Sequence, residues 1–335
     1  MRAVVMTAAG GPEVLQVQEV ADPQIQQATE MKVRLYAAGI NPIDTKIRQR
    51  GLFYPEALPA VLGCDGAGIV EAVGAAVQSF QVGDRVYFCN GGLGGHPGTY
   101  AEQAVIDERF AAPMPRSLSF VEAAALPLAL ITASEALFDR GRLSSGQQVF
   151  IQAGAGGVGH LAIQLAKQAG ARVCTTVSSA PKADFVRHLG ADQVILYRQT
   201  DPVKAALDWT GGAGVDLAFD TVGGSSLSQC FAATRIYGDV VTLLAPDAHT
   251  DWKTARDRNL RVSYELMLTP MLRGLVQAQA AQAEILRQVT KQFDQYPLQI
   301  QVQQTYDLAT AAQAHRDLEA GSLMGKLVLD LASSH

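Results

Sequence analysis

A glycine-rich loop in the middle of the chain has the spacing of an anion-binding turn. The segment Ile151–Gly159 follows a short apolar run and contains the pattern G-x-G-x-x-G. Gly154 permits a tight turn, Gly156 lets the backbone approach a pyrophosphate, and Gly159 lets a helix pack closely on the strand. The helix start, with Gly157–Val158 before it, offers amide groups and a positive dipole end. The loop is therefore predicted to bind a dinucleotide pyrophosphate; the alternative is a glycine-rich turn without a ligand.

The end of the next apolar run indicates which dinucleotide is bound. Sites for NAD usually place Asp or Glu here, where the carboxylate accepts a hydrogen bond from the ribose hydroxyl. In this chain Arg172–Val177 runs into Ser178 and Ser179, followed by Lys182, and the first carboxylate is Asp184. Two hydroxyls and an ammonium can bind a 2′-phosphate, which a carboxylate would repel. We therefore predict NADPH as the cofactor; the alternative is a serine helix cap followed by a solvated lysine.

The segments around this loop alternate between strand and helix. The segment Gly159–Ala169 places Leu161, Leu165 and Ala169 at one-turn spacing, as in an amphipathic helix. Strands that alternate with helices form βαβ units, so we predict a Rossmann-type, doubly wound parallel sheet. Short β-branched runs begin near Val149, Arg172, Gln193, Val215, Asp239 and Arg261.

Both ends of the chain have a different pattern. Met31–Leu35 alternates between apolar and charged residues, and connectors rich in Gly and Pro surround it, which is typical of antiparallel strands. After a helical stretch over Met271–Phe293, the tail is predicted to form a strand, a helix and a strand. These cover Gln299–Gln303, Ala309–Leu318 and Lys326–Leu329.

Composition excludes several classes of protein. The 335 residues favour two domains of about 100–200 residues each. A net charge of −5 without basic runs argues against a nucleic-acid partner, and no segment approaches the roughly 18 apolar residues of a membrane span. The N-terminus has the alternation of a strand and not of a targeting signal. Four scattered cysteines indicate reduced thiols and a cytoplasmic location.

Several short motifs, in their order and spacing, resemble the medium-chain dehydrogenase/reductase superfamily, specifically its zinc-free quinone oxidoreductase (zeta-crystallin-like) branch. The resemblance covers nearly the whole chain. Beside the glycine loop, the motifs are Ala37–Asp44, Leu62–Val70, Val82–Val86, Ala124–Pro127 with Thr132, Phe219–Gly223, and the closing segments 315–319 and 325–329.

The resemblance implies a GroES-like, mainly antiparallel β catalytic domain formed by both chain ends. The expected boundaries are 1–122 for its first part, 123–296 for the inserted Rossmann domain and 297–335 for its return. It implies an NADPH-dependent enzyme, commonly a homodimer, that transfers hydride to quinones or related α,β-unsaturated carbonyls. The alternatives are an enone or enoyl-thioester reductase, a zinc alcohol dehydrogenase, and a structural protein that holds NADPH with little turnover.

The same resemblance argues against a catalytic zinc. Zinc-dependent relatives place Cys where Asn41 stands, His where Cys64 stands, and a further Cys close to Leu128. Asn and Leu cannot supply the thiolates that zinc requires. A site formed by Cys64, Asp65, Cys89 and His96 is an alternative, but its spacing matches no common pattern.

The positions that match the family's nicotinamide pocket are Asn41, Tyr54 and Thr132, with Lys46 nearby. Asn41 can position an acceptor carbonyl or the nicotinamide ribose, and Thr132 can hold the carboxamide. Tyr54 matches a tyrosine that related enoyl reductases use as a proton donor, so its phenol could protonate the enolate. The alternative roles are a turn former, a helix cap and a loop anchor. Further cofactor contacts that the resemblance suggests are Tyr197, Val222 with Gly223, Leu243 with Leu244, and Lys326.

Overall fold

The structure is a computed structural model that describes residues 1–332, and the chain divides into two compact units. The inserted unit is Ala129–Met267. The two-segment unit combines Met1–Leu128 with the chain from Leu268 onward. The sequence predicted a nucleotide domain over 123–296, so the second boundary lies 29 residues earlier than expected (296 against 267). The segment in question contains a helix that packs on the strands of the two-segment unit, as described below.

The inserted unit contains a parallel sheet of six strands in the order β11-β10-β9-β12-β13-β14. This order, 3-2-1-4-5-6 counted within the unit, is that of a dinucleotide-binding fold with a reversal between its first and fourth strands. The predicted fold class is confirmed for this unit. Its strands are β9 Gln148–Ile151, β10 Arg172–Val177, β11 Gln193–Leu196, β12 Val215–Asp220, β13 Thr234–Thr242 and β14 Arg261–Tyr264.

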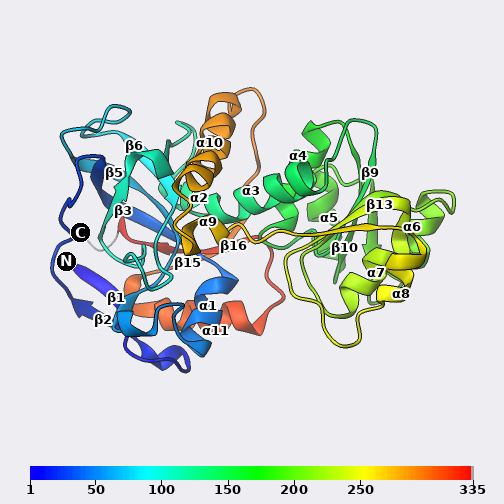
Figure 1. The fold of residues 1–335 in the computed structure, drawn as a ribbon, viewed down its shortest axis with the longest axis horizontal. Helices are drawn as coiled ribbons and strands as arrows, with labels where there is room; N and C mark the ends of the chain where they lie inside the picture. The colour runs from blue at the N-terminus through cyan, green and yellow to red at the C-terminus, as the bar shows by residue number, and fades with distance from the viewer. Residues whose placement is uncertain (333–335) are drawn as a thin grey trace. The chain divides into compact units, whose positions relative to one another are not determined.

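Helices pack on this sheet because its central strands β9, β10 and β12 are buried along nearly their whole length, on both faces. α7 contacts α6 and α8, and these three helices lie side by side in Figure 1. The core between sheet and helices includes Phe150, Leu227 and Phe231, all fully buried. Its helices are α3 Pro127–Ser134, which starts in the preceding unit, α4 Gly159–Gln168, α5 Ala180–His188, α6 Pro202–Trp209, α7 Ser225–Ala233 and α8 Trp252–Asp257; a π-helical segment covers Glu135–Arg140.

The two-segment unit contains two sheets formed mostly by antiparallel pairs. The larger has the order β15-β16-β3-β5-β6-β8, with β7 also paired to β3, and the smaller has the order β2-β1-β4. β16, from the end of the chain, pairs antiparallel with β3, so both chain segments share one sheet. The strands are β1 Arg2–Met6, β2 Leu15–Glu19, β3 Glu30–Ile40, β4 Ala60–Val61, β5 Asp65–Val73, β6 Arg85–Cys89, β7 Gln103–Asp107, β8 Ala111–Pro113, β15 Val302–Tyr306 and β16 Lys326–Asp330.

The helices of this unit cover its sheets. They are α1 Pro42–Arg50, α2 Phe120–Ala124, α9 Thr269–Leu272, α10 Val276–Gln292 and α11 Ala311–Ala320, with 3₁₀ turns at Pro12–Val14, Pro55–Ala57, Glu108–Phe110 and Leu308–Thr310. Among residues 1–332 no helix is both long and apolar enough to cross a membrane.

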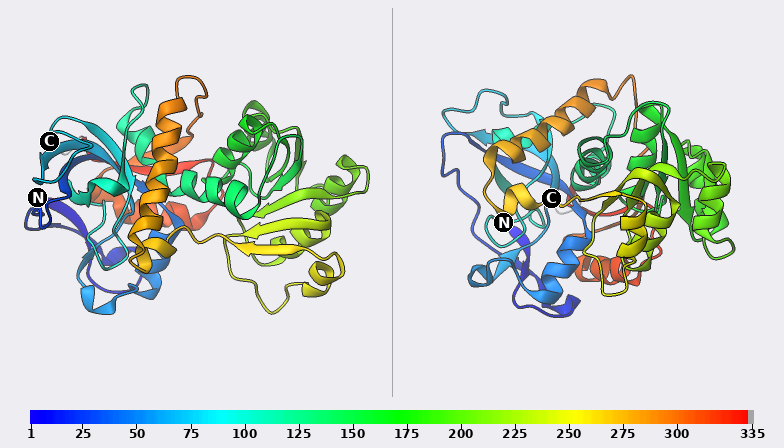
Figure 2. Two further views of the ribbon diagram at one scale, coloured as in Figure 1. Left: turned by 45° about the horizontal axis from the view of Figure 1, so that its top comes forward. Right: turned by 45° about the vertical axis from the view of Figure 1, so that its right-hand side comes forward.

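The helix α10 explains the shifted domain boundary. It packs against β8 and β6, and it is the long orange helix in Figure 2. The Tyr87 hydroxyl of β6 donates to the Leu286 carbonyl at 2.8 Å, and Gln279 donates to Asn90 at 2.8 Å. The expected helical stretch is broken at Gly274, where φ is +61°, between α9 and α10. An Ala/Gln-rich helix shows its length in the sequence but not which unit it will cover.

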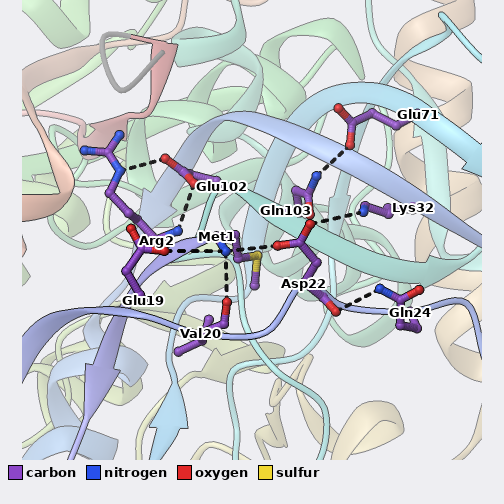
Figure 3. A network of polar contacts seen from close by, with 10 residues as sticks. All are labelled: Met1, Arg2, Glu19, Val20, Asp22, Gln24, Lys32, Glu71, Glu102 and Gln103. Carbon is purple, nitrogen blue, oxygen red and sulfur yellow. Dashed lines mark hydrogen bonds and ion pairs between the residues drawn. The ribbon is translucent and has the colours of Figure 1, made fainter.

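The N-terminal strand is anchored by a network of charged groups (Figure 3). The Met1 ammonium donates to the Val20 carbonyl at 2.8 Å and to Asp22 at 2.9 Å, which raises the pKa of the ammonium and lowers that of Asp22. Arg2 binds Glu102 through both its backbone amide and its side chain. These bonds hold β1, which bridges to Ala101 through Ala3 and donates a backbone hydrogen bond to Tyr100 through Val4.

Candidate active site

The glycine loop lies where β9 ends and α4 begins. The Gly154 amide donates to the Thr176 carbonyl and the Ala153 amide to the Thr176 hydroxyl, so β10 holds the loop in place. Val158 is the N-cap of α4 and makes no side-chain capping bond. The first amides of a helix have no acceptor within the helix, so this end is suited to an anion.

The three glycines of the pattern are needed for different reasons. A Cβ on Gly154 would lie 2.1 Å from the Thr175 hydroxyl, and one on Gly159 would lie 2.4 Å from the Ala153 carbonyl. Both are therefore required by packing within the chain. A Cβ on Gly156 would meet only the Ala153 carbonyl, at 3.2 Å. Gly156 is thus the least crowded of the three by the chain itself, and its missing side chain fits the approach of a ligand such as a pyrophosphate.

The residues predicted to bind the 2′-phosphate of NADPH follow the end of β10. Ser178 and Ser179 are half-buried, and Ser179 occupies the N-cap position of α5 without making a capping bond through its side chain. The cap interpretation therefore does not account for its hydroxyl. Lys182 is half-buried, and its pKa is lowered by burial and by nearby Arg198. Two cations and two hydroxyls, from the segments that follow the neighbouring strands β10 and β11, form a surface for a doubly charged anion.

The carboxyl ends of the other strands carry further predicted contacts. Val222 follows β12 and is half exposed, while Leu243 follows β13 and donates its amide to the Asp220 carbonyl at 3.1 Å. Tyr197 follows β11 and is 48% exposed, so it does not pack under the following loop. Thr132 lies buried in α3. Ligands of parallel α/β sheets bind at these strand ends, which agrees with the positions of the first three residues.

In the two-segment unit, three strand ends bring Asn41, Asp65 and Lys326 together. Leu327 pairs with Ile40 between β16 and β3, and Gly39 pairs with Asp65 between β3 and β5. Lys326 and Asn41 are the neighbours of those paired residues. The Asn41 amide donates to Asp65 at 2.9 Å, and the Lys326 ammonium donates to the Asn41 carbonyl oxygen. All three side chains are at most 5% exposed.

The charges of this cluster are balanced within the fold. The Lys326 ammonium lies 3.9 Å from Asp65 Oδ2, and the Leu128 amide donates to Asp65 Oδ1 at 2.9 Å. Burial raises the pKa of Asp65 and lowers that of Lys326, while their mutual attraction opposes both shifts. Burying either charge without the other would be strongly destabilising. The pair therefore forms one unit around the Asn41 amide.

A second buried carboxylate lies one helical turn away. Asp44 accepts the backbone amide of Asn41 at 2.8 Å as part of a capping box at the start of α1, and it accepts the Tyr100 hydroxyl at 3.0 Å. Its other oxygen has no hydrogen-bond partner among the described residues. Burial raises the pKa of Asp44 to about 7. Tyr100 also contacts His315, whose pKa is lowered to about 3 by burial and by Arg48.

Tyr54 is placed in a different setting from Asn41. It caps the short turn Pro55–Ala57 and is 37% exposed. Its hydroxyl donates to the Leu272 carbonyl at 3.0 Å, the kind of bond expected of a loop anchor. Proton donation by Tyr54 stays a prediction, and it requires this bond to be exchanged for one to the acceptor. Lys46 is half-buried on α1, and burial lowers its pKa.

The arrangement agrees with comparisons to known proteins. Residues 27–116 match the alcohol dehydrogenase GroES-like domain and residues 189–329 match the zinc-binding dehydrogenase family. The chain is 33% identical over 324 residues to Quinone oxidoreductase 1 of Escherichia coli (strain K12), with 96% of each protein covered. This chain belongs to the quinone oxidoreductases of the medium-chain dehydrogenase/reductase superfamily. The resemblance in its motifs is thereby confirmed.

Solved structures agree with this assignment to the quinone oxidoreductases. An alcohol dehydrogenase superfamily protein from Novosphingobium aromaticivorans has a TM-score of 0.90 at 35% identity, with 99% of both chains covered. The Escherichia coli quinone oxidoreductase complexed with NADPH has a TM-score of 0.86 at 31% identity, covering 98% of this chain and 100% of that one. The predicted combination of GroES-like and Rossmann-type domains is confirmed.

One of the two matching families is named for zinc binding. The residues of this quinone oxidoreductase do not fit a zinc site. The positions that match zinc ligands hold Asn41, Cys64 and Leu128, of which only the thiol is a ligand type for zinc. Within residues 1–332 no three His, Cys, Asp or Glu side chains are grouped to hold a metal. In the alternative set, His96 is exposed while Cys64, Asp65 and Cys89 are buried.

Sequence reasoning named Asp65 only as a ligand of the alternative metal site and assigned no role to Asp44 or Arg198. Asp65 was visible as a carboxylate inside the otherwise apolar motif Leu62–Val70, which is a recognisable signal for a buried polar role. Asp44 was part of the N-P-I-D motif, where a capping box could have been expected. Arg198 follows a strand by two residues, and only the parallel pairing of β10 with β11 places it near Lys182.

Proposed function

We propose that this chain is an NADPH-dependent oxidoreductase that reduces quinones or related α,β-unsaturated carbonyls without a catalytic metal. The observation that carries the proposal is twofold: the inserted unit has hydroxyls and cations after β10 and β11, and the two-segment unit has a buried Asn41 amide with fixed partners. Its relatives named quinone oxidoreductases, and the NADPH complex of one of them, support the same activity.

The inserted unit has the groups that such a cofactor needs. The loop Gly154–Gly159, including Gly157 and Val158, receives the pyrophosphate at the start of α4. Ser178, Ser179 and Lys182 bind the 2′-phosphate, with Arg198 added to them. Tyr197 would contact the adenosine phosphate, Val222 and Leu243 would contact the nicotinamide, and Thr132 would hold its carboxamide.

When bound, NADPH supplies a hydride to the acceptor. In the two-segment unit Asn41 positions the acceptor carbonyl or the nicotinamide ribose through its amide. Tyr54 or water then delivers the proton that the reduced acceptor needs. Holding the reacting groups in line and excluding water are the main contributions of these residues. An enone or enoyl-thioester reductase would use the same residues with another acceptor.

The location and assembly of the protein belong to the same proposal. We propose a cytoplasmic homodimer. All four cysteines are buried and none forms a disulfide, as expected of a reducing compartment. The edge strand β14 exposes Arg261 and Tyr264, and it could pair with its copy across a two-fold axis.

The direct test is oxidation of NADPH in the presence of quinones, enones and aldehydes, with metal content measured on the same sample. We expect turnover with a quinone or an enone that is unchanged after dialysis against a chelator. Loss of turnover on chelation and its recovery with Zn²⁺ would contradict the metal-free mechanism. Absence of turnover with every acceptor, despite tight NADPH binding, would favour a binding protein.

A further inference from the structure

The Lys326 ammonium is buried in a position where it has few possible roles other than an electrostatic one. The side chain is 5% exposed, and its nitrogen donates to the Asn41 carbonyl oxygen and lies 3.9 Å from Asp65. Burial of a lysine ammonium is costly unless a counter-charge and hydrogen bonds compensate it. The compensation here comes from Asp65, with Asp44 as a second nearby carboxylate.

The positions that match zinc ligands of related enzymes lie around Asp65, the carboxylate that the ammonium faces. Asn41 and Leu128, at two of the three ligand positions, both hydrogen-bond to Asp65. The third, Cys64, is the residue before Asp65, and its buried thiol contacts Cys89. The anionic surroundings of the site are thus retained, while the thiolates are missing and a lysine from β16 is present.

The amide of Asn41 is held at both ends. Its nitrogen donates to Asp65 at 2.9 Å, and its oxygen accepts from Lys326. A flipped amide would turn its NH₂ group toward the ammonium, which has only donors to offer. The lysine therefore selects one of the two orientations of the amide. The second N–H of the amide is the group left to donate to a ligand.

We propose that Lys326 is a built-in cation that takes the place of the metal in this site and acts as a positioning residue for Asn41. The ammonium neutralises the buried carboxylate of Asp65, and it fixes the amide orientation in which Asn41 donates to the acceptor or to the nicotinamide ribose. Lys326 thus acts through Asn41 and not by direct contact with the cofactor. This inference rests on the proposed function for its catalytic part, while the cation site itself can be tested without turnover.

The first test is replacement of the lysine by a free amine. Lys326→Ala removes the side chain beyond Cβ, and n-propylammonium has the missing atoms. We expect the melting temperature of the variant to rise with n-propylammonium until saturation, and not with propanol or sodium chloride. The matched controls are Lys326→Met, which fills the cavity with apolar atoms, and Lys167→Ala, which removes a lysine paired with Asp192 on the surface of the inserted unit. Neither should show the saturable rise.

The second test measures whether Lys326 acts through Asn41. With NADPH and a good quinone, Lys326→Ala should lose about 10²-fold in kcat, as misplacement of a positioning group does, with the KM for NADPH little changed. n-Propylammonium should restore part of this loss. Because the effect passes through Asn41, Lys326→Ala should cost little further kcat when Asn41→Ala is already present.

The outcomes separate this proposal from the proposed function. A folded Lys326→Ala that does not respond to n-propylammonium, or a Lys326→Met with wild-type kcat and stability, would overturn the built-in cation. If Lys326→Ala does not fold, Lys326→Met with Asp65→Asn removes both charges. This double variant should fold with a kcat about 10²-fold below that of the wild type, and full activity would refute the positioning role. A wild-type protein that binds NADPH but reduces no acceptor would refute the proposed function, even where the amine raises the melting temperature.

Discussion

At the scale of single residues, the site combines one buried group with several partners and one partly exposed group with a single partner. Asn41 is buried, and both ends of its amide have partners. Tyr54 is partly exposed and holds a single backbone carbonyl. A group that must align a substrate benefits from fixed partners, whereas a proton donor has to exchange its hydrogen bond during turnover. The two environments match the two roles proposed for these residues.

The role of Tyr54 can be tested by removing its hydroxyl alone. Tyr54→Phe keeps the ring, and if the phenol is the acid, kcat on an enone should fall by about 10²–10⁴-fold. NADPH affinity should barely change, and quinone turnover should fall much less because water can protonate a hydroquinone oxygen. Tyr296→Phe, at another exposed tyrosine, is the control. An unchanged kcat on an enone, with a deuteride isotope effect showing that chemistry limits the rate, would leave water as the donor and Tyr54 as a loop anchor.

Asp44 should make stability depend on pH. Its pKa is about 7 in the folded chain against 3.8 as a free side chain, because burial disfavours the charge. Between about pH 4 and 7 the folded state holds the proton more tightly than the unfolded state, so this group's contribution to stability falls as pH rises and is constant above 7. Asp44→Asn keeps an acceptor for the Asn41 amide and removes the charge.

We therefore expect Asp44→Asn to gain stability relative to wild type as pH rises from 4 to 8, by at most about 4 kcal/mol. Urea unfolding at several pH values measures this difference. Asp184→Asn, at a carboxylate that is 78% exposed, should show little pH-dependent difference. A stability difference between Asp44→Asn and wild type that is the same at every pH would contradict the raised pKa.

At the scale of elements, sequence periodicity located most of the inserted unit. β10, β11, β12 and β14 begin at the residues where the runs predicted them. β13 begins at Thr234 and not near Asp239, because its pairing with β12 is irregular between those two points. Tyr237, in that interval, has a φ of +60° and is exposed, so the strand has no apolar pattern there. Irregular pairing depends on the neighbouring strand and has no local signal.

The junction of β10 with α5 should determine cofactor choice. Because Ser178, Ser179 and Lys182 stand where NAD sites have a carboxylate, NADPH should bind at least about tenfold tighter than NADH, roughly 1.4 kcal/mol. Fluorescence titration with both nucleotides measures this ratio. Ser178→Asp with Lys182→Ala should narrow or reverse the preference, and Arg198→Ala should lower the affinity for NADPH more than that for NADH.

The control for cofactor choice is Lys204→Ala, which removes an exposed lysine paired with Asp208 on α6 and should leave the ratio unchanged. Equal affinities of the wild-type protein for NADPH and NADH would contradict the prediction that the residues after β10 bind the 2′-phosphate. If Arg198→Ala leaves the ratio of the NADPH and NADH affinities unchanged, Arg198 has no part in the 2′-phosphate site, while the assignment of Ser178, Ser179 and Lys182 is unaffected.

At the scale of the whole molecule, the chain order separates residues that the fold joins. Asn41 and Lys326 were each recognised from their own motifs, yet their contact, across 285 positions, follows from the antiparallel register of β16 and β3. The return of the chain to the first unit was expected from the family resemblance. The residue at which the chain returns was not expected, because the packing of α10 on β6 and β8 decides to which unit this helix belongs.

The native protein should not react covalently with its proposed electrophilic substrates. Quinones add to thiolates, and all four cysteines of the chain are buried, with their pKa raised. Desolvation contributes to each increase, and thiolate is the reactive form. This arrangement should protect the thiols of a quinone reductase from arylation by its own acceptor.

We therefore expect no rapidly reacting thiol in the native protein at neutral pH, and four after denaturation, in a titration with a disulfide reagent. Intact mass after incubation with benzoquinone should show the unmodified chain. Arg256→Cys, at a side chain that is 79% exposed, should react fast and serves as the control. A wild-type thiol that reacts in the native state as fast as this added cysteine would show that one of the four sites opens readily, and Cys64 and Cys89, beside the Asn41 cluster, would be the first to map.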